Sequence, residues 1–266
     1  MLRKLLKYEI KATGRIFLPL FLALLVFAGI TRVISDISPE TWSTPANISM
    51  LIYIIIMVGM FVMTFTMMIQ RFHKNLLTDE GYLMLTLPVK PWKHIVSKLL
   101  VSMLWIITSG IAAFISILII SLEKGDIAEI TEGFATFYHL VFEQLGTSAY
   151  ILSFEIILGI FISLASGILV IYTSIAIGHL FRQHKMFASF GAFIILSNLS
   201  QVLFMLISMI PGITHLFNIN DASHDFIGML PIIQLIIAYG IIFIGLLSAA
   251  YFATTNFILS KRLNLE

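Results

Sequence analysis

The sequence contains no cysteine, and only 11% of its residues are charged. Without cysteine the chain can form no disulfide, attach no c-type haem and offer no thiolate to a metal. The sequence also has no glycine-rich phosphate loop ending in Lys followed by Ser or Thr. We therefore expect no catalytic residues, no metal site and no resident cofactor in this chain.

Apolar residues are abundant, at 59% of 266 residues, and one water-soluble core could not bury that much apolar surface. A lipid bilayer is the expected solvent, and each spanning helix needs roughly 20 mostly apolar residues. The pattern predicts an all-α membrane protein. Its transmembrane domain covers residues 15–260 and is followed by a short tail at 261–266. The long apolar runs predict six transmembrane helices, near residues 16–34, 47–70, 97–122, 149–180, 186–210 and 229–258.

The basic residues are distributed unevenly between the predicted loops. Fourteen of the 16 Lys and Arg residues fall in the N-terminal segment, in residues 71–98, around Arg182 and Lys185, and at the C-terminal end. Lys and Arg are retained on the cytoplasmic side of short loops. The distribution therefore predicts cytoplasmic N and C termini and a cytoplasmic loop at residues 71–96.

Two segments outside the spans have amphipathic patterns. Residues 1–14 predict an interfacial helix, with the basic residues on one face and leucines on the other. Glu9 falls within the apolar face, where it could either pair with a Lys or Arg of a neighbouring element or reach toward water. Residues 126–145 predict a helix on the outer surface, either a cap over the ends of the spans or, less simply, a gate for substrate.

The loop at residues 71–96 has the features of a short helix. Thr78 can cap a helix whose first turn holds two acids, which the exposed amides there favour, and Pro88 ends it. A short helix held between two spans can act as a lever, because a protein that grips it from the cytoplasm can move both spans.

The residues of this loop resemble the cytoplasmic signature of ABC-2 type exporter permeases. The matching positions are Asp79, Glu80, Gly81, Leu85, Leu87, Pro88, Val89, Ile95 and Lys98. The resemblance implies a coupling helix between spans 2 and 3 that docks into a separate ATP-binding subunit. Family members often continue with glycine, threonine, leucine and glutamate, so the Tyr82, Leu83 and Met84 found here imply a more apolar docking surface. The residues expected to contact the ATPase are Thr78, Asp79, Glu80, Gly81, Tyr82, Leu83, Leu85, Leu87 and Pro88.

The resemblance also implies partners and a location. It implies two copies of an ABC ATPase, which bind ATP and Mg, and a second permease subunit, either the same chain or a related one. The expected site is a bacterial plasma membrane, surrounded by lipid, and the expected cargo is an amphipathic peptide of the phenol-soluble modulin or lantibiotic type. No nucleic acid is expected as a partner. A non-transporting membrane scaffold or regulatory protein is the alternative, and an ion-coupled transporter is disfavoured because only one acid lies within a span.

Polar side chains inside the spans are the candidates for a substrate path or a subunit seam. Such groups are costly in hydrocarbon and should face protein or water. The acid is Glu155, which could attract a cationic group or pair with a neighbouring helix. A packing role is the simpler interpretation for each candidate, of which there are four: Glu155, Asn198, Gln201 and Gln234.

Overall fold

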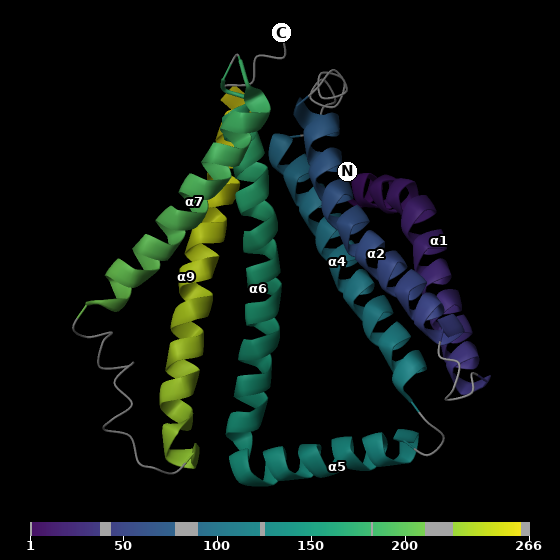
Figure 1. Cartoon of the computed structure of the whole chain (residues 1–266). Helices are drawn as coiled ribbons and strands as arrows, with labels where there is room; N and C mark the ends of the chain where they lie inside the picture. Colours follow the sequence, from purple (N-terminus) through teal and green to yellow (C-terminus); the bar gives the residue numbers. More distant parts are fainter. Residues whose placement is uncertain are drawn as a thin grey trace. The chain divides into compact units, whose positions relative to one another are not determined.

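The computed structural model of the chain describes residues 2–37, 44–77, 90–122, 126–181, 183–210 and 226–261. Within these ranges all regular structure is α-helical (Figure 1). The helices in chain order are α1 (Leu2–Ile37), α2 (Thr44–Leu77), α4 (Pro91–Ser121), α5 (Asp126–Leu145), α6 (Thr147–Gly178), α7 (Lys185–Ser208) and α9 (Phe226–Lys261).

Six of these helices, all except α5, are long and apolar enough to cross a membrane. The predicted all-α class and the six predicted spans are therefore confirmed for the described residues, and the architecture is that of a multi-pass membrane protein. The helices extend past the predicted spans at both ends of the predicted loop. Helix α2 continues to Leu77 and α4 begins at Pro91, so much of the predicted 71–96 loop is helical.

The reason for this difference is that hydropathy and helical structure end at different places. A hydropathy boundary falls at the first charged residue, whereas a helix continues into the polar region as long as its backbone hydrogen bonds are made. Proline is well tolerated in the first turn of a helix, where its missing N–H would have no helical partner, and it therefore makes Pro91 a suitable first residue. The predicted coupling helix and its candidate residues from Thr78 to Pro88 lie outside the described residues.

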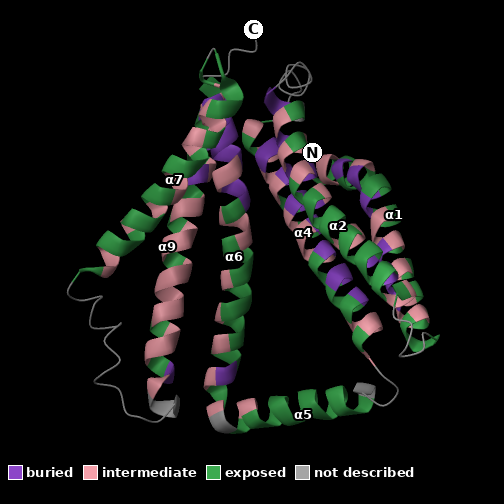
Figure 2. Ribbon diagram, viewed as in Figure 1, coloured by how far each residue is buried: buried purple, intermediate pink, exposed green. Residues whose placement is uncertain are grey.

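The chain divides into two compact units, Met1–Glu129 and Ile130–Glu266. In the first unit α1 packs against both α2 and α4, and these two also contact each other. Figure 2 shows buried residues along the facing sides of these three helices. Their shared core contains side chains from all three helices, namely Leu24, Ala28, Tyr53, Met60, Ala112 and Ala113.

Hydroxyl groups join α2 to α4 at two levels of this unit. Tyr53 and Ser116 share a hydrogen bond of 2.8 Å, and Thr64 and Ser109 share one of 2.9 Å. Small side chains on α4 let the helices approach closely enough for these bonds. The two bonds hold α2 and α4 together along their length.

Helix α1 changes direction after its first turns (Figure 1). Pro19 lies inside the helix and cannot donate a hydrogen bond to the carbonyl of Arg15, one turn earlier. Such a loss bends a helix in the turn before the proline. Residues 2–14 of the predicted segment 1–14 are helical and continuous with the first span, while the location of this segment at a membrane interface stays a prediction.

In the second unit α6 packs against α9 and α7. Buried residues gather toward the C-terminal end of α6, where Thr173 bonds to Thr255 of α9 with a distance of 3.0 Å between the hydroxyl oxygens. The first half of α6 and the whole of α7 are mostly exposed and apolar, as expected for helices in lipid. At the end of α6, Gly178 lies directly against the start of α7.

The predicted helix at residues 126–145 is confirmed as α5, with the same bounds. Its aromatic residues Phe134 and Phe137 are exposed, as are the acids Glu129 and Glu132. A helix with both kinds of side chain on its surface fits a polar–apolar boundary. Its predicted place on the outer surface stays a prediction.

Candidate functional site

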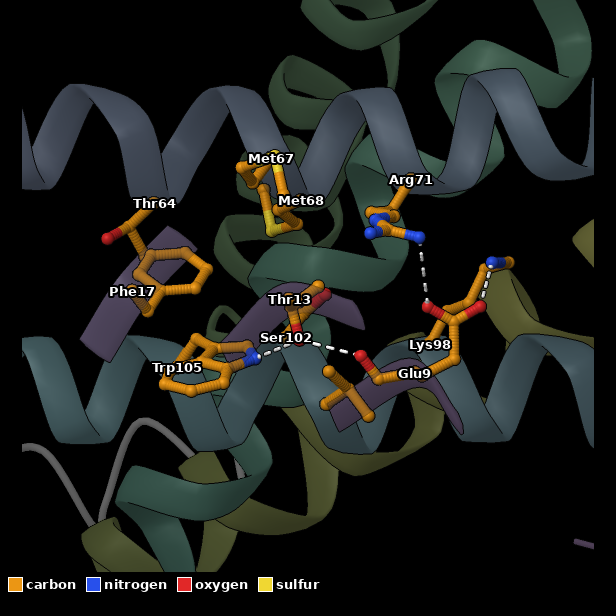
Figure 3. Close-up of a pocket in the computed structure, with 11 residues that line it drawn as sticks. Glu9, Thr13, Phe17, Thr64, Met67, Met68, Arg71, Lys98, Ser102 and Trp105 are labelled. Atoms are coloured by element: carbon orange, nitrogen blue, oxygen red, sulfur yellow. Dashed lines mark hydrogen bonds and ion pairs between the residues drawn. The ribbon is translucent and has the colours of Figure 1, made fainter. Parts of the chain in front are cut away.

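A carboxylate from the start of α1 lies between two cations from two other helices. The Oε1 atom of Glu9 accepts a hydrogen bond of 2.7 Å from the Nζ atom of Lys98 on α4. The Oε2 atom of Glu9 lies 3.8 Å from a guanidinium nitrogen of Arg71 on α2. Figure 3 shows the two cations approaching different oxygens of the carboxylate. Of the two alternatives for Glu9, pairing with a neighbouring element is therefore the one that the structure has.

The two cations differ in how much they depend on Glu9. The Lys98 side chain is 2% exposed and that of Glu9 is 11% exposed, so this pair is buried. A buried charge is costly unless it is paired, and the Glu9 carboxylate gives Lys98 a charged partner at hydrogen-bond distance. The Arg71 side chain is 27% exposed and lies farther from Glu9. Solvent therefore screens the Arg71–Glu9 pair, and this pair contributes less to stability than the Lys98–Glu9 pair.

A second set of contacts lies one helical turn after Glu9 on α1. The hydroxyl of Thr13 donates to the backbone carbonyl of Glu9 at 2.7 Å, and it accepts a hydrogen bond of 2.8 Å from the indole N–H of Trp105. The Trp105 ring stacks on Phe17, with 4.4 Å between ring centroids. These contacts fix the first turns of α1 against α4, because a buried indole N–H needs a partner and Thr13 provides it.

A small cavity lies beside this cluster. Its volume is about 20 Å³, which is enough for a single water molecule and far too little for a peptide. The arrangement is therefore a junction between three helices, and it does not have the dimensions of a substrate pocket. The cavity is lined by Glu9, Thr13, Phe17, Thr64, Met67, Met68, Arg71, Lys98, Val101, Ser102 and Trp105.

The junction lies beside the segment of the predicted coupling helix. Arg71 lies less than two turns before the end of α2, and Lys98 lies two turns after the start of α4. These two helix ends flank residues 78–89, the segment that carries the predicted coupling helix. The cluster therefore joins the beginning of the chain to both helices next to that segment.

The polar candidates inside the spans are not brought together. Within the described residues no hydrogen bond or ion pair links any two of them. Gln234 donates to the carbonyl of Ser148 at 3.3 Å and so ties α9 to α6. Asn198 is exposed and bonds to Ile194 in its own helix, and Gln201 is exposed as well. These polar residues stay candidates for a subunit interface or a substrate path.

Glu155 is half-buried on α6. Its Oε2 atom is shielded from solvent and has no hydrogen-bond partner among the residues that the structure describes. A carboxylate in hydrocarbon marks a position worth testing for function.

Several residues of the charge cluster were not singled out from the sequence. From the sequence, Arg71 is only one of the basic loop residues, and Thr13 and Trp105 have no predicted role. One pattern in the sequence points to this face: Glu9 and Thr13 are four residues apart, and polar residues at that spacing share one face of a helix. His94, one turn before Lys98 on α4 and 2% exposed, has no role predicted from the sequence either.

The chain was also compared with known proteins. No protein-family model, no curated protein and no solved structure matched it. The class defined by the fold, a multi-pass α-helical membrane protein, rests on the helices themselves.

Proposed function

We propose that this chain is the membrane-spanning permease subunit of an ABC-2 type exporter, which moves amphipathic peptides out of a bacterial cell using ATP hydrolysed by a separate subunit. One observation carries the proposal beyond the loop resemblance. The Glu9 cluster joins the start of α1 to the end of α2 and the start of α4. These are the helix ends that the proposed coupling helix, which begins after Thr78 and ends at Pro88, would move.

The packing of the first unit supports a lever mechanism. Hydrogen bonds between α2 and α4 at Tyr53–Ser116 and Thr64–Ser109 resist separation of these two helices. The Lys98–Glu9 pair attaches α1 to them at the same end as the coupling segment. A displacement of residues 78–89 would then move the three helices as one body, which is how rigid elements transmit a domain motion.

The proposal includes the partners and the orientation. Two ABC ATPase subunits would bind ATP and Mg and grip the coupling segments of two permease chains, identical or related. Both termini would be cytoplasmic, as the distribution of Lys and Arg supports. ATP-driven closure of the ATPases would tilt the spans and open the seam between the permeases outward. The chain itself would have no enzymatic activity and no cofactor.

Docking is tested by co-expressing the chain with a candidate ABC ATPase and substituting Glu80→Ala and Gly81→Val. Both substitutions should reduce copurification of the ATPase and the ATPase activity that the permease stimulates. Glu132→Ala is the matched control, since this exposed acid lies outside the coupling segment. Unchanged copurification in the first two variants would argue against docking at this loop and in favour of a scaffold role.

Transmission is tested separately with Glu9→Gln. This residue is buried beside Lys98 and is not available for docking, so the variant should still copurify with the ATPase. Its peptide-stimulated ATP hydrolysis should fall, because the variant loses the ion pairs that join α1 to α2 and α4 next to the coupling segment. Full stimulation in a folded Glu9→Gln variant would contradict the lever mechanism and leave docking unaffected.

A further inference from the structure

Glu155 lies on the side of α6 that faces α9. These two helices run in the same direction in the second unit (Figure 1), and contacts between them bracket this residue. Seven residues earlier, the carbonyl of Ser148 accepts a hydrogen bond from Gln234. Four residues later, a Cβ at Gly159 would lie 3.5 Å from the Ile241 side chain. Because residues at these spacings share one face of a helix, the Glu155 carboxyl group is at the boundary between α6 and α9.

From the sequence, Glu155 could either pair with a neighbouring helix or attract a cationic group. Among the residues that the structure describes, its shielded Oε2 atom has no hydrogen-bond partner. Residues 211–225, which join α7 to α9, contain two His residues but no Lys or Arg. By chain position, the second unit therefore has no Lys or Arg at the level of Glu155. Its basic residues all come after the C-terminal end of α6 or at that of α9, namely Arg182, Lys185, Lys261 and Arg262.

The surroundings of Glu155 select the chemistry of a ligand. A carboxylate in hydrocarbon is costly unless it is paired or takes up a proton. A divalent metal ion needs several oxygen ligands, and the described part of the chain has no group of three or more His, Asp or Glu residues that could hold one. Neighbouring side chains on α6, among them Ile151, Phe154 and Ile156, are apolar and exposed. A ligand that fits these surroundings has one positive group and an apolar body.

We propose that Glu155 binds the positively charged group of an amphiphilic organic cation, whose apolar body lies in the surrounding lipid. Glu155 comes six residues after the start of the predicted span at 149, which is about 9 Å along the helix axis. A charged group anchored near that end of the span can reach the carboxyl group while its apolar body stays in hydrocarbon. This inference goes beyond the proposed export function, since it requires only that α6 spans a membrane.

Aromatic side chains lie at the same level of the second unit. Tyr239 on α9 comes between the two residues of α9 whose contacts with α6 bracket Glu155. The ring of Phe204 on α7 lies 5.7 Å from the Tyr239 ring and 5.2 Å from the Phe243 ring, measured between centroids. Aromatic faces attract organic cations and also offer apolar contact. These rings therefore suit the same class of ligand as the carboxyl group.

The absence of cysteine allows a single reporter to be placed at this site. Ile151 lies one turn before Glu155 and is 48% exposed, so Ile151→Cys gives the full chain one accessible thiol. The thiol is labelled with bimane, and the protein is reconstituted in nanodiscs of zwitterionic phosphatidylcholine. Two nitroxide probes with the same hexadecyl chain are compared, because a nitroxide quenches bimane fluorescence at close range. One probe has a quaternary ammonium head and the other a zwitterionic phosphocholine head.

The cationic probe should bind beside the label about tenfold more strongly than the zwitterionic probe, which corresponds to about 1.4 kcal/mol. Glu155→Gln should bring this ratio to about one, because the amide has nearly the same size and no charge. Glu155→Asp should keep part of the preference, because it retains the charge on a shorter side chain. Glu143→Gln is the matched control, since this exposed acid lies on α5 outside the site, and it should leave the ratio unchanged. Helical circular dichroism checks that each variant is folded.

Three results would overturn the proposal. Equal quenching by the two probes in the labelled Ile151→Cys protein would show that no amphiphilic cation binds there, and this comparison needs no Glu155 variant. Equal loss of the preference in Glu143→Gln would assign it to general surface charge. Reversal of the quenching by tetramethylammonium chloride, at a concentration where sodium chloride has no effect, would mean that the site takes a water-soluble cation rather than an amphiphilic one.

Discussion

The Glu9→Gln substitution tests the charge cluster most directly, because it keeps the size of the side chain and removes its charge. Lys98, with a side chain only 2% exposed, would lose its 2.7 Å partner and stay buried. Leaving one member of a buried ion pair without its partner costs about 3–5 kcal/mol. The lost contact with Arg71 adds less than about 1 kcal/mol, because that residue is partly solvated. We expect Glu9→Gln to lower the free energy of unfolding by about 3 kcal/mol or more.

The measurement is reversible unfolding in mixed micelles of increasing denaturing-detergent fraction, followed by Trp105 fluorescence in the Trp42→Phe/Trp92→Phe background. A double-mutant cycle separates the pair from other effects. Glu9→Gln combined with Lys98→Met removes both charges, and the double variant should recover most of the lost free energy, because an uncharged pair no longer leaves a buried cation.

Glu132→Gln, a change to an exposed acid on α5, is the control and should alter the free energy of unfolding by less than about 0.5 kcal/mol. The reasoning is refuted if Glu9→Gln costs less than about 1 kcal/mol. It is equally refuted if the costs of Glu9→Gln and Lys98→Met simply add, since additive costs indicate residues that do not interact.

The remaining predictions concern the second unit and use unfolding in the same mixed micelles, followed by the loss of helical circular dichroism because Trp105 lies in the first unit. A Cβ at Gly178 would contact the Ser189 hydroxyl and lie 2.7 Å from its backbone nitrogen, so Gly178→Ala should cost about 2 kcal/mol through overpacking. Gly167 has no atom within 4 Å of such a Cβ, so Gly167→Ala should be neutral or slightly stabilising, and equal effects at both sites would contradict the packing. Thr173→Val removes the hydroxyl that bonds to Thr255 and should cost about 1 kcal/mol. A neutral result would show that this bond adds nothing to the packing of α6 on α9.

The charge cluster also suggests why the start of α1 is rich in polar groups at buried positions. Glu9 and Thr13 occupy one face of the helix, and both find partners on α4. An apolar residue at either position would pack as well but would not fix which part of α4 it faces. Polar pairs that must match can specify a register between helices.

The identity of the spans could be predicted from the sequence because it depends on a local property. Each span is a continuous stretch of apolar residues long enough to cross hydrocarbon, and no information about neighbours is needed to recognise it. The helix at 126–145 could be predicted for the same reason, since apolar residues at helical spacing are also a local pattern. The helix ends of α2 and α4 could not be predicted in this way, because hydropathy reports where a segment becomes polar and not where its helix ends.

The partners of Glu9 were decided only by the tertiary structure. The sequence allowed any nearby Lys or Arg, or none, because the choice depends on which faces of α1, α2 and α4 meet. Arg71 and Lys98 are 62 and 89 residues away in the chain, and no local pattern connects them to Glu9. Hydrophobicity acts on each segment separately and so can be read from the sequence, whereas an ion pair needs two specific atoms at one place, which only the packing of the helices determines.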